Sequence, residues 1–94
     1  MIIVSRDKEI INNFDNILGI QIDEHIFNSN GEKDYEIKVI TEKRVANMGV
    51  YETKERAKEV LQDILKHAQE SISYHAVGSG VWQKYESVYE MPAE

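Results

Sequence analysis

Apolar residues recur at intervals of three and four between positions 57 and 72, which places them on one stripe of a helix. Thr53 stands where a helix N-cap is expected, and Glu55 in the first turn favours the positive end of the helix dipole. The segment 48–72 therefore predicts the end of a strand, a capped turn and one long amphipathic helix. The apolar stripe consists of Ala57, Val60, Leu61, Ile64, Leu65, Ala68 and Ile72.

Before this helix, short runs alternate between apolar and polar residues, as expected for strands with one buried face. The third and fourth runs are separated by Asn28-Ser29-Asn30-Gly31, a strong turn signal whose Asn-Gly pair can take the positive φ values of a type I′ hairpin. Lys43 and Arg44 fall in the next turn. The alternating positions of the third and fourth runs are Leu18, Ile20, Ile22, Tyr35, Ile37, Val39 and Thr41, and the runs together predict strands at 1–4, 10–11, 17–27, 35–41 and 46–51.

The chain after the helix holds a glycine-rich connector, residues 78–80, and a last alternating run. In that run Tyr85, Ser87, Tyr89 and Met91 share one face, and Pro92 ends it. Ninety-four residues suffice for one core, so residues 1–94 are predicted to form a single domain. The predicted fold class is α+β: an antiparallel β-meander of about five strands, one long amphipathic helix packed on it, then a C-terminal strand.

Composition narrows the classes of function. The absence of cysteine excludes disulfides and thiolate catalysis and favours a reducing cytoplasm. A formal net charge of −6 opposes the binding of a DNA or RNA polymer, because affinity for nucleic acid comes mainly from neutralised phosphates. No run approaches the length of about eighteen apolar residues that a membrane span needs, and the apolar start of the chain lacks the basic segment of a signal peptide.

The residues that could perform catalysis do not form a recognisable set. Asp63, His67 and His75 could ligate zinc, but a histidine bordering a solvated face and another in a loop explain the spacing more simply. The Gly78-Ser79-Gly80 segment lacks the spacing of a nucleophile elbow and of phosphate-binding loops, and the carboxylates are scattered. We therefore predict no enzyme activity, no catalytic or metal-binding residues and no cofactor.

Four of the eight aromatic residues cluster between positions 74 and 89. Such rings can stack on a base or fill a subunit interface, although covering the sheet is the simpler interpretation. Arginine and lysine side chains nearby could meet a phosphate. The residues predicted to bind a ligand are Trp82, Tyr85 and Tyr74 for stacking, with Arg44, Arg6 and Lys84 for phosphate.

Three segments of the sequence resemble segments of a known group of proteins: MIIVSRDKEIINNFDN, GVYETKERAKEVLQDI and VYEMPAE. They resemble a family of small proteins from phages and mobile elements of low-GC Gram-positive bacteria, and the chain is similar to the anti-CBASS sponges. That resemblance implies a homo-oligomer in the bacterial host cytoplasm that evades immunity by sequestering a small anionic ligand, such as a cyclic dinucleotide, between subunits without cleaving it. The alternative is a non-enzymatic protein-binding inhibitor or regulatory module that uses an exposed sheet edge or acidic face.

Overall fold

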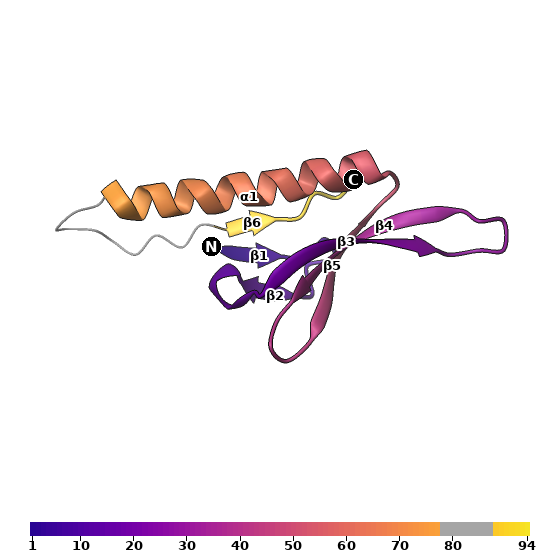
Figure 1. Ribbon diagram of the computed structural model, residues 1–94, viewed down its shortest axis with the longest axis horizontal. Helices are drawn as coiled ribbons and strands as arrows, with labels where there is room; N and C mark the ends of the chain where they lie inside the picture. The colour runs from indigo at the N-terminus through magenta and orange to yellow at the C-terminus, as the bar shows by residue number, and fades with distance from the viewer. Residues whose placement is uncertain (78–87) are drawn as a thin grey trace.

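The computed structural model describes residues 1–77 and 88–94, with side chains described for residues 1–69 and 88–94. Within these residues the α+β class is confirmed, because strands and one long helix form a single layered arrangement (Figure 1). The elements are β1 (Ile2–Val4), β2 (Ile11–Asn13), the 3₁₀ turn η1 (Phe14–Asn16), β3 (Gly19–Ile26), β4 (Lys33–Ile40), β5 (Val45–Tyr51), α1 (Lys54–Val77) and β6 (Val88–Glu90).

The strands divide into two three-stranded sheets. The predicted antiparallel meander is confirmed for β3, β4 and β5, whereas the first two of its five predicted strands, β1 and β2, belong to the other sheet. The second sheet has the order β2-β1-β6, in which β1 pairs antiparallel with β2 and parallel with β6, so that Ile3 lies opposite Tyr89. The predicted C-terminal strand is present from Val88 onward, while its predicted residues 85–87 lie outside the described part of the chain.

The core lies between α1 and the inward faces of the two sheets. The predicted helix stripe is confirmed at its centre, although Leu65 is 41% exposed and therefore lies at the margin of the stripe. The prediction for Leu18 is wrong: it is 68% exposed, because β3 begins only at Gly19, after η1. The buried apolar residues are Met1, Ile3, Ile37, Val39, Ala46, Met48, Tyr51, Ala57, Val60, Ile64, Ala68, Tyr89 and Met91.

The N-terminus of α1 is capped as predicted. Arg56 donates its backbone N–H to Thr53 Oγ1 at 3.1 Å, and Ala57 donates to the Thr53 carbonyl at 3.1 Å. The hydroxyl bond satisfies a donor that the first helical turn would otherwise leave unpaired, and the bond from Ala57 is the first i→i−4 bond of the helix. The cap fixes where the chain turns from β5 into the helix.

The loop between β3 and β4 falls where it was predicted, but the type I′ geometry is wrong. A type I′ turn needs positive φ at both central residues, whereas here only Gly31 has one, at +79°. Phe27 donates its N–H to the Glu32 carbonyl at 3.1 Å and thereby closes a four-residue loop. Asn28 Oδ1 accepts from the N–H groups of Asn30 and Glu32, at 2.9 and 3.2 Å. The side chain of Asn28 thus selects the longer loop.

A β-bulge in β5 positions its last aromatic residue. Ile37 lies opposite Gly49 and Lys38 opposite Asn47, so Met48 is an extra residue in the ladder. The extra residue shifts the alternation, and Tyr51 therefore points into the core together with Met48. Tyr51 Oη donates to the Pro92 carbonyl at 2.9 Å, which ties the residues after β6 to the meander.

The turn after β1 places Arg6 against the outer edge of β5. Ser5 is buried, and its hydroxyl donates to Asp7 Oδ1 at 2.6 Å while accepting from the Ile10 N–H at 3.0 Å. This turn directs the Arg6 N–H to the Met48 carbonyl at 2.7 Å. The Arg6 guanidinium also donates to the Val50 carbonyl. Arg6 therefore joins the two sheets and occupies two edge carbonyls of β5.

Candidate functional site

An open hollow of about 1120 Å³ lies where the β3–β4 hairpin, the end of β5 and the start of α1 meet. The bulge in β5 and the Thr53 cap shape it, because they set the direction in which the chain enters the helix. Most of its lining residues are charged or polar, and Phe27, Val50 and Tyr51 contribute apolar surface. The lining residues are Arg6, Phe27, Glu32, Lys33, Asp34, Val50, Tyr51, Glu52, Thr53, Arg56 and Glu94.

The three cations of the hollow all have partners within the chain. The Arg6 guanidinium donates to Val50 and lies 5.5 Å from the centre of the Tyr51 ring. Lys33 Nζ lies 2.8 Å from Glu24 Oε1, and this hydrogen bond raises the pKa of the lysine. Arg56 donates through Nε to the Glu94 carbonyl at 2.8 Å and through Nη1 to Glu59 at 3.4 Å. An anionic ligand would have to displace these partners.

Acidic side chains also line the hollow, namely Glu32, Asp34, Glu52 and Glu94. They outnumber the three cations, so the hollow does not present a field of one sign to a phosphate group. Mixed charge of this kind is typical of the polar rim of a protein interface. The mixed charge of the hollow therefore suits contact with another protein better than the binding of a ligand with several phosphates.

The structure does not gather the predicted ligand-binding residues into one site. Arg6 lines the hollow described above, whereas Arg44 lines a separate hollow of about 740 Å³ beside the β4–β5 turn. These two hollows share no lining residue. Tyr74 belongs to α1, but its side chain is outside the described set, as are residues Trp82, Lys84 and Tyr85 in full.

The end of the β3–β4 hairpin exposes two adjacent apolar residues that are not among the predicted ligand-binding residues. Ile26 is 60% exposed and Phe27 is 50% exposed. Figure 1 shows this hairpin extending past the N-terminal end of α1, so the helix does not cover its tip. The available signal was an Ile-Phe pair directly before a turn, at the end of a predicted strand. The pattern alone could not show that the helix stops short of it.

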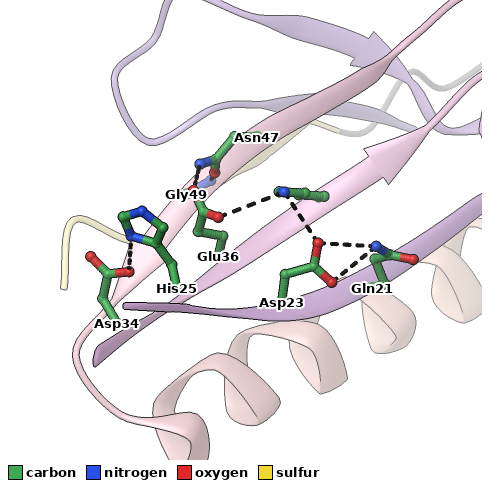
Figure 2. Close-up of polar contacts among 8 residues, drawn as sticks. Gln21, Asp23, His25, Asp34, Glu36, Asn47 and Gly49 are labelled. Carbon is green, nitrogen blue, oxygen red and sulfur yellow. Dashed lines mark hydrogen bonds and ion pairs between the residues drawn. The ribbon is translucent and has the colours of Figure 1, made fainter. Parts of the chain in front are cut away.

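The outward face of the meander carries a row of polar side chains that bond to one another (Figure 2). Lys38 Nζ bridges Asp23 at 3.1 Å and Glu36 at 3.6 Å, and the hydrogen bond from Lys38 lowers the pKa of Asp23. Gln21 adds a bond of 2.9 Å to Asp23, and Asn47 donates to Glu36 at 2.7 Å. These groups satisfy one another across three strands, so this row stabilises the sheet.

The histidines do not form a metal site in the described part of the chain, where no group of three metal-ligating side chains occurs. His67 Nδ1 lies 3.0 Å from the Asp63 carbonyl oxygen, and its ring packs edge-on against Tyr89 with centres 4.9 Å apart. His67 thus contributes to the contact between α1 and β6. The side chain of His75 lies outside the described residues.

Among the described residues, no helix is long and apolar enough to cross a membrane. Comparisons of the chain with protein-family models, with curated proteins and with solved structures find no match in any of the three.

Proposed function

We propose that this protein acts by binding another protein, as a non-enzymatic inhibitor or regulatory module, and that the β3–β4 hairpin supplies the contact surface. The observation that carries this proposal is the exposed pair of Ile26 and Phe27 at the end of the hairpin, beyond the cover of α1. Aromatic residues are enriched in protein interfaces, and because successive side chains of a strand point to opposite faces, Ile26 and Phe27 place an exposed apolar side chain on each face of the hairpin end.

The hairpin also holds this pair in a defined position. β3 and β4 pair in unbroken register from Gly19 opposite Ile40 to Ile26 opposite Lys33. The Asn28 side chain then fixes the loop, because its Oδ1 accepts from two backbone N–H groups. A surface that is ordered before binding loses less conformational entropy in a complex. The charged hollow beside Phe27 would form the polar rim of the same interface.

Site-specific photocrosslinking in cells tests this proposal. Benzoylphenylalanine at position 27 should capture a discrete partner, whereas the same group at Lys58, on the exposed face of α1, should not. In the protein that carries the probe at position 27, Ile26→Ser should reduce the yield of that product, because it removes apolar contact area on the opposite face of the same hairpin end. The proposal would be contradicted if probes at positions 27 and 58 gave the same crosslinked products. It would also be contradicted if Ile26→Ser left the yield of the product from position 27 unchanged.

The sequestration of a cyclic nucleotide without cleavage, in the bacterial cytoplasm, is a second candidate. It is supported by the approach of Arg6, Lys33 and Arg56 to one open hollow beside Phe27, whose ring could stack on a base. As a sponge, the protein would be a homo-oligomer with the ligand between subunits. Binding would require Arg56 to exchange its bonds to Glu59 and Glu94 for phosphate contacts.

Isothermal titration against cyclic dinucleotides and trinucleotides tests this candidate. Arg56→Gln should weaken binding if the hollow holds the ligand, and Arg44→Gln serves as the matched control in the separate hollow. A larger loss of affinity with Arg44→Gln than with Arg56→Gln would place the ligand site at the β4–β5 turn instead. The absence of binding heat with every member of the series would remove this candidate.

A further inference from the structure

The two edges of the meander differ in whether they can accept another strand. At the β5 edge, Arg6 occupies the carbonyls of Met48 and Val50 through its backbone N–H and its guanidinium. The edge strands of the other sheet, β2 and β6, span three residues each. β3 spans eight residues, and within the described part of the chain it pairs only with β4.

The direction of the backbone groups of β3 follows from its ladder. In an antiparallel pair, residues alternate between those that exchange hydrogen bonds with the partner and those whose N–H and C=O point away. The bond from Phe27 N–H to the Glu32 carbonyl fixes this alternation at the hairpin end. The residues whose backbone groups point away from β4 are therefore Ile20, Ile22, Glu24 and Ile26.

The side chains along this edge define the chemistry of a partner strand. On the core side, Ile20 and Ile22 are only half-buried, so an added strand would cover their remaining apolar surface. On the outward side, the edge presents Gln21, Asp23 and His25. The hairpin from Gly19 to Ile40 carries five carboxylates and two lysines; the lysines pair with Asp23, Glu24 and Glu36, and the remaining excess of three carboxylates makes the field of the hairpin negative. A partner strand with alternating apolar and basic residues complements both faces.

Charge also argues against a second copy of this chain as the occupant. Antiparallel pairing of β3 with another β3 centred on Asp23 places that carboxylate directly opposite its own copy. Like charges in cross-strand pairs destabilise a sheet. The same edge that attracts a basic segment therefore resists self-association, which is one way in which proteins protect an open edge.

We infer that the edge of β3 that no strand of the described residues covers is the docking site for an extended, basic and apolar segment of a partner protein, which adds as a fourth strand to the β3–β4–β5 sheet. This inference rests on the proposed protein-binding function and names the chemistry of the partner. The main-chain bonds of β-strand addition supply affinity, while the alternating side chains supply selectivity.

The test uses the full chain and a blocked (Lys-Val)₄ peptide, with (Glu-Val)₄ as the charge control. Binding of (Lys-Val)₄ should slow hydrogen exchange at the amides of Ile20, Ile22, Glu24 and Ile26, as followed by NMR. It should weaken as salt is raised, since the attraction is partly electrostatic. A (Lys-Val)₄ peptide N-methylated at every residue retains its charge but cannot donate backbone bonds, and it should bind at least about tenfold more weakly.

Charge reversal of the edge provides a second arm. Asp23→Lys with Glu24→Lys should transfer the preference to (Glu-Val)₄, whereas Glu42→Lys with Asp15→Lys, which changes the net charge equally away from the β3 edge, should not. Asp23→Asn with Glu24→Gln replaces the reversal if the reversed chain fails to fold, and should reduce the affinity for (Lys-Val)₄.

Three outcomes would overturn the inference: equal binding of the N-methylated peptide, unprotected amides along β3, or a homodimer that protects the same amides. Successful photocrosslinking at position 27 with unprotected β3 amides would leave the proposed function standing and remove only the strand addition. Failure of the crosslinking itself would refute the proposed function.

Discussion

Replacement of Gly49 by alanine tests the role of the β-bulge in packing Tyr51. A methyl group at Gly49 would lie 3.0 Å from Tyr51 Oη, 3.1 Å from Cε2 and 3.3 Å from Cζ, which is closer than ordinary contact. Tyr51 is 2% exposed and its hydroxyl bonds to the Pro92 carbonyl, so the ring cannot move aside freely. Overpacking of a core costs about 1–3 kcal/mol. The loss of glycine flexibility in the unfolded chain returns about 0.4–1 kcal/mol, which leaves a net loss of about 1–2 kcal/mol.

Urea denaturation followed by far-UV circular dichroism measures this loss. With a slope of about 1.5 kcal/mol per molar urea, Gly49→Ala should lower the midpoint by roughly 1 M. Gly19→Ala is the matched control in the same sheet, because its methyl group would meet only Ile40 Cδ1, at 3.9 Å. That variant should be as stable as the wild type or up to about 1 kcal/mol more stable.

The double variant Gly49→Ala with Tyr51→Phe isolates the contact. Removal of Oη deletes the nearest atom, so alanine at position 49 should cost less in the Phe background than in the wild type. Wild-type stability of Gly49→Ala would refute the packing argument. An unchanged penalty in the Phe background would show that the hydroxyl is not responsible.

Three further changes probe the pH dependence and the helix cap. Burial raises the pKa of Tyr89 to about 12, while its unfolded value stays near about 10, so stability should be complete below about pH 10 and fall as the pH rises toward about 12; urea midpoints across this range should vary less in Tyr89→Phe. Thr53→Ala should lower the free energy of unfolding by about 1 kcal/mol, whereas Thr53→Ser should retain most of it; equal urea midpoints for the two variants would contradict the capping role. Lys38→Met should raise the pKa of Asp23 toward its ordinary value in an NMR titration. The loss of stability as the pH falls through the pKa of Asp23 should then be smaller in this variant than in the wild type.

The parts of the fold that the sequence predicts are those with local causes. The alternation around Ile37 and Val39 assigns the faces of β4, and the hydroxyl of Thr53 marks the start of α1. No short stretch of the sequence predicts the division into two sheets, because the parallel pairing of β1 with β6 depends on residues that are far apart in the sequence. The bulge at Met48 is equally hidden, since the strand pattern on either side of it looks regular.

The candidate site was harder to predict than the fold. Arg6 and Arg44 were selected for their charge, but only the tertiary structure shows that Arg6 covers the edge of β5 and that Arg44 lines another hollow. Ile26 and Phe27 read as ordinary strand residues in the sequence. Their exposure follows from the point at which α1 begins, which depends on the path of β5 and its bulge.

The pairing of β1 with β6 has a consequence for the order of folding. Ile2 lies opposite Val88, so nearly the whole chain separates the two strands, and closing a loop of that length costs about 4 kcal/mol of entropy. On the ribosome, β1 can form its hairpin with β2 early, but it must wait for the C-terminal strand before Ile3 is fully covered. We expect the meander and α1 to form first and the β1–β6 contact to close last, because β1 and β6 are far apart in the sequence.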